Sequence, residues 1–165
     1  MTTTTTTGDA ASDSYREFIE SKRIAFEACG ITIDKNDLNP MLFDFQKDIV
    51  TWALHKGKAC IFLGTGLGKT FIQLSWAEQI HKHTGGNVLV VAPLAVAMQS
   101  VHEGEKIGIP VHICRSQSDV KPGVNITNYD MLHAFNPSEF IGVVLDESSI
   151  LKSFEGKVRT QIIDS

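Results

Sequence analysis

The amino-acid sequence predicts an α/β protein in which helices cover a mainly parallel sheet. Short, almost entirely apolar runs recur along the chain, which is typical of strands that are buried on both faces. Helical patterns separate most of these runs, as parallel strands joined by crossover connections require. One run leads directly into a glycine-rich segment and then a helix, and another ends in two adjacent carboxylates.

The composition is that of a single folded domain. The chain has 165 residues, which is close to the usual size of one domain. Hydrophobic residues make up 42% and charged residues 21%, and this excludes general disorder. The net charge is −4, with 15 basic and 19 acidic residues, which argues against a protein that coats nucleic acid through bulk charge.

The sequence carries no pattern for export or membrane insertion. No uncharged apolar run approaches the ~20 residues that span a bilayer. Residues 1–8 are mostly threonine and lack the basic and apolar regions of a secretory signal. The three cysteines form no CxxC pair, so we expect reduced thiols in a cytoplasmic protein, with Cys60 and Cys114 filling the core.

The N-terminal part divides into a tail and a helical extension. Residues 1–13 are polar and of low complexity, and we expect them to be disordered. We expect a helical extension at 14–38, because the segment from Ser14 to Glu17 has a capping-box pattern and Gly30 is suited to end the helix. The predicted domain covers 39–165 and begins with a turn and a helix at about 43–56.

From residue 59 onward, predicted strands and helices follow one another. The apolar runs predict strands at 59–63, 88–92, 111–114, 124–127 and 141–145. Helices are expected at about 68–83 and 95–106, and Pro93 marks the end of the second strand.

The segment from Leu63 to Thr70 has the pattern of a phosphate-binding loop. Its glycines let backbone amides approach phosphates, and the helix start adds positive partial charge. Lys69 can then reach the β- and γ-phosphates, and the Thr70 hydroxyl can ligate Mg²⁺. The strict pattern has glycine in place of Leu63, but the ending from Gly66 to Thr70 is intact. A glycine turn that binds nothing is the alternative interpretation.

Two carboxylates end the last predicted strand. Asp146 can hold Mg²⁺ through its hydration shell, opposite Thr70, and Glu147 can orient and deprotonate the attacking water. Since the loop and the acids both follow strands of a parallel sheet, we expect them at the same carboxyl edge. A solvated turn is the alternative. No Asn-Lys-x-Asp or Leu-Ser-Gly-Gly motif occurs, so the pattern favours a RecA-like ATPase over a GTPase or a transporter.

These motifs resemble the N-terminal RecA-like domain of superfamily-two (DEAD/DEAH- or Swi/Snf-like) helicases and translocases, and the resemblance is closest to phage and prophage helicases. It covers residue 39 to the end and includes, in family order, Phe43–Gln46 (Q motif), Leu63–Thr70 (motif I), Val91–Leu94 (Ia), Ile126–Asp130 (Ib) and Val144–Ser149 (II). The chain departs from the family at Leu63 and at Ser148-Ser149, where many relatives have Ala-His or Ala-Asp.

The resemblance implies a fold, cofactors and site residues. The fold would be a three-layer RecA-like domain, apparently truncated after motif II, and the cofactors would be ATP and Mg²⁺. The implied site has Gln46 at the adenine, Thr65, Gly66, Leu67, Gly68, Lys69 and Thr70 at the phosphates, Thr70 and Asp146 at the metal, and Lys69 and Glu147 in hydrolysis. Motifs Ia and Ib border the nucleic-acid track in the family, so the implied partners are nucleic acid, DNA in the first place, and a second RecA-like lobe or another protein.

Three functions stay open. In that family the second lobe supplies arginine fingers, so we expect weak or no hydrolysis by this chain alone. The chain could be the ATP-binding lobe of a DNA helicase or translocase, a stand-alone nucleotide-binding module that needs a partner lobe, or a binding protein without turnover. Gln46 could instead be an exposed helix residue, and Thr127 and Asn128 ordinary turn residues. His81 and His83 are expected to cap a helix end rather than bind metal.

Overall fold

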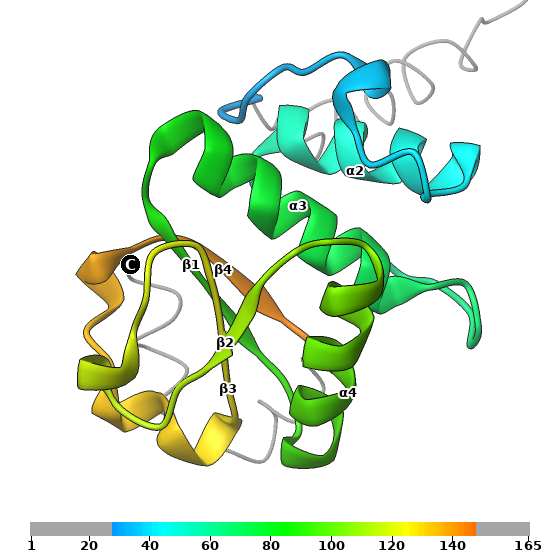
Figure 1. Ribbon diagram of the computed structural model, residues 1–165. Coiled ribbons are helices and arrows are strands. Elements are labelled where there is room, and N and C mark those ends of the chain that lie inside the picture. The colour runs from blue at the N-terminus through cyan, green and yellow to red at the C-terminus, as the bar shows by residue number, and fades with distance from the viewer. Residues whose placement is uncertain (1–27, 148–165) are drawn as a thin grey trace, which may run out of the picture.

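A computed structural model describes residues 28–147 and contains a four-stranded, all-parallel sheet. The N-terminal half consists of η1 (Lys35–Asp37), α2 (Asp44–Lys56), α3 (Lys69–Thr84), β1 (Asn87–Val91) and α4 (Leu94–Lys106). The C-terminal half consists of β2 (Val111–Ile113), η2 (Gln117–Asp119), β3 (Val124–Thr127), η3 (Tyr129–Ala134), η4 (Pro137–Glu139) and β4 (Phe140–Leu145) (Figure 1). The η elements are short 3₁₀-helices. The predicted α/β class with a parallel sheet is therefore confirmed.

The strand order is β2-β3-β1-β4, which places the first strand between two that come later in the chain. Val91 at the end of β1 lies opposite Thr127 of β3 and opposite Leu145 of β4. The carboxyl ends of these three strands therefore line up at one edge of the sheet. This is the edge at which open α/β sheets bind ligands.

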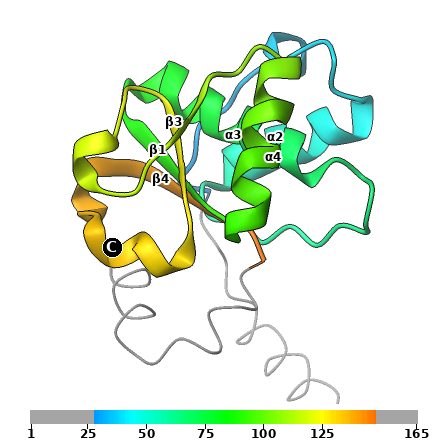
Figure 2. The ribbon, with the colours of Figure 1, turned by 60° about the horizontal axis from the view of Figure 1, so that its bottom comes forward.

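The two faces of the sheet are covered differently. Val88 and Val90 belong to a large core cluster that also contains residues of α3 and α4, whereas Leu89 and Val91 pack with Tyr129 and other apolar residues from the η3 region. This alternation follows from the two-residue period of a strand. Figure 2 shows α3 and α4 on one side of the strands, and α2 packs against α3.

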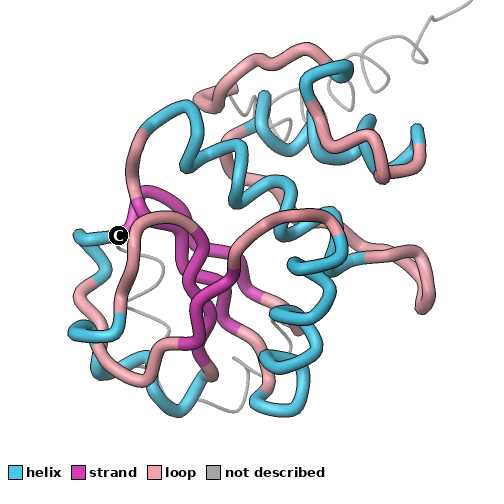
Figure 3. The backbone as a smooth tube through the Cα atoms, viewed as in Figure 1, coloured by secondary structure: helices cyan, strands magenta, loops and turns pink. Residues whose placement is uncertain are grey.

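Most predicted helices and strands agree with the structure to within two residues. The predicted strand at 59–63 is wrong, because these residues form no strand and are largely accessible to solvent. Phe62 is 91% exposed, and Cys60 is exposed rather than part of the core. The segment lies in the loop between α2 and α3, drawn in pink in Figure 3, and pairs with none of the four strands. Cys114 is buried, as predicted.

Several predictions lie outside the described residues. These are the tail at 1–13, the start of the extension at Ser14, and the motif II residues Ser148 and Ser149. Of the extension at 14–38, the structure describes the part from residue 28 onward, which is irregular except for η1, and the helix expected to end at Gly30 lies almost wholly outside the described residues. Among residues 28–147, no helix has the length and apolar character needed to cross a bilayer.

Candidate functional site at the carboxyl edge of the sheet

The glycine-rich loop ends at Gly68, which caps the N-terminus of α3. Gly66 and Gly68 have φ angles of 82° and 72°, a left-handed conformation that favours glycine. The structure shows no acceptor within residues 28–147 for the backbone amides from Thr65 to Thr70. Unpaired amides at a helix start are a suitable environment for a phosphate group. The loop therefore leaves backbone donors unpaired at the start of α3.

The side chains of Lys69 and Thr70 extend from the first turn of α3. Lys69 is exposed and Thr70 is partly buried. Gln73 lies on the same helix face, because residues three and four positions apart are neighbours on a helix surface. From this position the side chain of Gln73 reaches the acidic pair that follows β4.

A hydrogen bond joins α3 to the residue that follows β4. The amide Nε2 of Gln73 donates to Oδ1 of Asp146 over 2.9 Å. The backbone amide of Asp146 donates to the carbonyl of Val91 over 2.8 Å, which extends the pairing of β4 with β1. The start of α3 and the carboxylate of Asp146 thus lie at the same edge of the sheet, as the sequence predicts for the loop and the acidic pair.

Glu147 has a left-handed backbone with φ of 56°, and among residues 28–147 it is the one non-glycine residue with a positive φ. This conformation costs roughly 1–2 kcal/mol for a residue with a Cβ atom. The side chain is exposed. A strained residue next to a carboxylate is a common feature of functional sites, and it agrees with a role for Glu147 there.

Tyr129 also contacts the acidic pair. Its hydroxyl donates a hydrogen bond to the backbone carbonyl of Asp146. Burial, together with the nearby negative charges of Asp146 and Glu147, raises the pKa of Tyr129 to about 12. The phenol therefore stays protonated at neutral pH. The sequence placed Tyr129 only in the segment that resembles motif Ib, and it gave no role to Gln73. Both residues bond to Asp146 from distant parts of the chain, and no local pattern indicates such a bond.

Gln46 is buried and contacts the phosphate loop, so the interpretation as an exposed helix residue is wrong. Its side chain is 3% exposed. The carbonyl Oε1 accepts from the amide of Phe43 over 3.0 Å, and Nε2 donates to the carbonyl of Leu67 over 3.1 Å. One side chain thereby caps α2 and holds the loop just before α3. This geometry places Gln46 beside the predicted nucleotide site.

The segments that resemble motifs Ia and Ib are neighbours in the structure. The amide of Ala92 donates to the carbonyl of Thr127 over 3.0 Å. Asn128 caps η3 by accepting from the amide of Met131. Thr127 is the last residue of β3 and is 2% exposed, so its interpretation as a turn residue is wrong. Both segments lie at the carboxyl edge, one at the end of β1 and the other at the end of β3, which neighbours β1 on the side away from β4.

The histidines at the end of α3 bond to nearby carbonyls. Nδ1 of His81 lies 2.8 Å from the carbonyl oxygen of Gly86, and Nδ1 of His83 lies 2.9 Å from that of Gln79. The predicted role of these side chains at a helix end is thus confirmed. Within the described part of the chain, no group of three or more His, Cys, Asp or Glu side chains could hold a metal ion. A single carboxylate and a hydroxyl still suit Mg²⁺, which takes its other ligands from phosphates and water.

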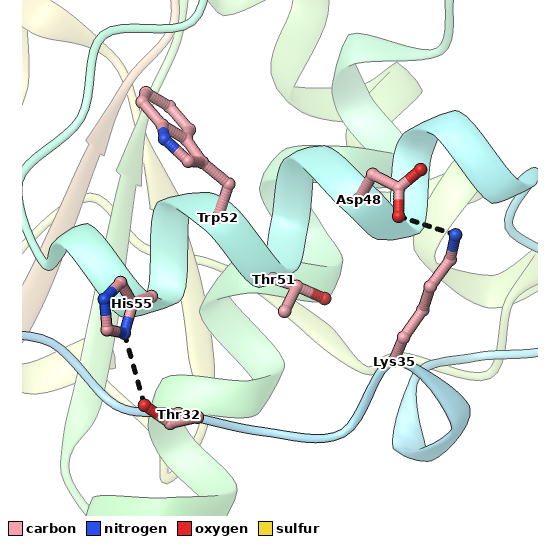
Figure 4. Close-up of a pocket in the computed structure, with 6 residues that line it drawn as sticks. All are labelled: Thr32, Lys35, Asp48, Thr51, Trp52 and His55. Atoms are coloured by element: carbon pink, nitrogen blue, oxygen red, sulfur yellow. Dashed lines mark hydrogen bonds and ion pairs between the residues drawn. The ribbon is translucent and has the colours of Figure 1, made fainter.

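A hollow of about 370 Å³ lies elsewhere, on the outer face of α2 (Figure 4). Its lining consists of Thr32, Lys35, Asp48, Thr51, Trp52 and His55. An ion pair of 2.6 Å joins Lys35 to Asp48, and a hydrogen bond of 3.2 Å joins Thr32 to His55. None of the predicted site residues lines this hollow.

Comparison with known proteins adds no assignment. No protein-family model matches the chain, and no curated protein matches it. A functional conclusion therefore depends on the residues of the carboxyl edge and on their geometry.

Proposed function

We propose that the chain binds Mg-ATP at the start of α3 and is the ATP-binding lobe of a DNA helicase or translocase, with the RecA-like fold that its motifs suggest. The observation that carries the proposal is the hydrogen bond from Gln73 to Asp146, because it joins the helix of the phosphate loop to the acidic pair. A shared edge alone is common to all such turns in a parallel sheet, so the specific bond between Gln73 and Asp146 is what supports the proposal.

The residues present fit this cofactor. The unpaired amides of the loop and the exposed ammonium of Lys69 would take the phosphates. The hydroxyl of Thr70 and the carboxylate of Asp146 would hold Mg²⁺, which would offset phosphate charge. Glu147 would orient and deprotonate the attacking water, and Gln46 would contact the adenine from its buried position at the loop.

Hydrolysis by this chain alone is expected to be slow. An arginine that reaches the γ-phosphate is worth roughly 10³–10⁵ in rate. Arg115 is the one arginine among residues 28–147, and it follows β2. Since β3 and β1 separate β2 from β4, Arg115 lies at the opposite side of the sheet from the acidic pair. An arginine from a partner lobe, or from the part of the chain outside residues 28–147, would be needed.

Nucleic acid is the proposed partner. The neighbouring ends of β1 and β3 carry the segments that resemble motifs Ia and Ib, and the bond from Ala92 to Thr127 keeps them side by side. The net charge of −4 gives no bulk attraction for DNA. We therefore expect weak binding by the chain alone.

A thermal-shift experiment tests nucleotide binding. At saturating Mg-ATP we expect the melting temperature to rise by about 5–10 °C, as binding at roughly 100 Kd implies for a domain of this size. Lys69→Ala should lose the shift. Lys106→Ala, which removes an exposed lysine at the end of α4, should keep it. An unchanged wild-type melting curve at millimolar Mg-ATP would remove the proposed function.

A further inference from the structure

The backbone of Asp146 is fixed on both sides. Its amide donates to the carbonyl of Val91, and its carbonyl accepts from the hydroxyl of Tyr129. With the backbone held, the remaining freedom is rotation of the carboxylate about its side-chain bonds. The direction in which the carboxylate oxygens face therefore depends on what the side chain contacts.

Gln73 makes that contact. Its amide Nε2 lies 2.9 Å from Oδ1, while the structure shows no partner for Oδ2 within residues 28–147. We infer that Gln73 is a positioning residue, which holds Oδ1 of Asp146 so that Oδ2 is presented to the hydrated Mg²⁺ of a bound nucleotide. This inference rests on the proposed function and adds to it a residue outside the phosphate-loop motif.

The amide suits this role because it is a neutral donor. A lysine or arginine at the same position would also donate to the carboxylate, but its charge would repel Mg²⁺ and offset the charge of Asp146. An amide hydrogen bond leaves the full negative charge available to the metal. Partners that orient a metal ligand in this way commonly change metal affinity by about 10–100-fold when they are lost.

Gln73 is itself held firmly. Its neighbours in the helix, Ile72 and Leu74, are 1% and 0% exposed, so the face of α3 that Gln73 occupies is fixed by the core. The side chain of Gln73 is partly buried, which limits its rotation. The bond from Gln73 therefore holds the carboxylate of Asp146 against a helix that the core fixes in place.

The test separates metal binding from nucleotide binding. Binding of a fluorescent ATP analogue is measured in EDTA, and Mg²⁺ is then titrated at fixed nucleotide. Gln73→Met keeps the length of the side chain and removes the donor. We expect about a tenfold increase in the Mg²⁺ concentration at half-saturation, at the lower end of the range for lost orienting partners, with unchanged affinity in EDTA.

Gln99→Met is the matched control. Nε2 of Gln99 donates to Oε1 of Glu103 over 2.8 Å, so this variant removes the same kind of bond on the exposed side of α4. It should leave both affinities unchanged. If Gln73→Met does not fold, Gln73→Asn gives the same test, because it keeps the amide but is one methylene shorter.

The outcomes are distinct. The inference is overturned if folded Gln73→Met or Gln73→Asn needs the same Mg²⁺ concentration at half-saturation as wild type. It is also overturned if the variant loses nucleotide affinity equally with and without Mg²⁺, because that result would indicate a structural role. Absence of nucleotide binding by the wild-type chain under both conditions would instead remove the proposed function itself.

Discussion

Tyr129 and Asp146 are joined by a hydrogen bond from the phenolic hydroxyl to the backbone carbonyl, across the top of the sheet. Tyr129 follows β3 and Asp146 follows β4, and β1 lies between these strands. The bond thus connects the two sides of the central strand at the carboxyl edge. Tyr129 is also 5% exposed and packs with Phe135 and Leu89, so its position is fixed by the core as well.

This contact predicts a dependence of stability on alkaline pH. Tyr129 has a folded pKa of about 12, above the value of about 10 of an unfolded chain. Its neutral form therefore contributes stability that is complete below pH ~10 and is lost as the pH rises through ~12. Tyr129→Phe should be less stable at pH 7 by about 1 kcal/mol, the usual worth of one hydrogen bond, and the difference should shrink above pH 10. Denaturant unfolding at pH 7 and pH 11 measures this, and a constant difference between the two proteins would contradict it.

The left-handed backbone of Glu147 predicts a stabilising substitution. Glycine adopts φ of 56° without strain, so Glu147→Gly should raise the free energy of unfolding by up to about 1 kcal/mol, even though glycine gains freedom in the unfolded state. Glu139→Gly is the control, because Glu139 is an exposed glutamate without a positive φ, and this variant should not be stabilised. Urea unfolding of both variants tests the prediction. Equal effects at the two positions would show that the conformation of Glu147 carries no strain.

Two serines in helices predict opposite effects of the same substitution. Oγ of Ser75 is buried and has no hydrogen-bond partner among residues 28–147, whereas Oγ of Ser100 is bonded to the carbonyl of Val96 over 3.0 Å. Ser75→Ala should stabilise the protein by about 1 kcal/mol, because it removes an unsatisfied hydroxyl and improves helix propensity. Ser100→Ala should be neutral or destabilising. Thermal unfolding ranks the two variants, and a loss of stability in Ser75→Ala would show that its hydroxyl has a partner after all.

The cysteines should differ in reactivity. Cys60 is exposed in the loop before α3, while Cys114 is buried and hydrogen-bonded to Asn125. Burial, with a smaller contribution from Asp119, raises the pKa of the Cys114 thiol, which lowers its thiolate fraction. A thiol reagent at pH 8 should modify Cys60 rapidly and Cys114 slowly, as followed by mass spectrometry of peptides. Denaturant should remove the difference, and slow labelling of Cys60 in the native protein would contradict its exposure.

The sequence was informative where local pattern decides the structure. The helix from Lys69 and the strands around Val88 and Ile126 could be predicted, because apolar period and helix-ending residues are local properties. The prediction of a strand at 59–63 was wrong. Its apolar residues have the composition of a strand, but a strand also needs a neighbour, and pairing depends on tertiary context that composition does not contain.

The candidate site, too, could be predicted only in part. The acidic pair could be placed at the carboxyl edge, since it follows a predicted strand that the structure contains. The same argument places the loop at this edge for the wrong reason, because no strand precedes it. The loop reaches this edge through α3, whose Gln73 bonds to Asp146. The contacts of Gln73, Tyr129 and Gln46 could not be predicted from the sequence, because each joins residues that are distant along the chain. No periodicity specifies which polar side chain will bond to which partner.

The central position of β1 also has a consequence for how the chain reaches its native state. During synthesis, residues 87–91 emerge before either flanking strand has been made. Their backbone amides and carbonyls therefore stay without strand partners until β3 and β4 have been synthesised. The contact of α2 with α3 is closer in sequence and can form earlier. We therefore expect the helical layer to collapse first and β4 to close the structure last, which brings the acidic pair to the phosphate loop in the final step of folding.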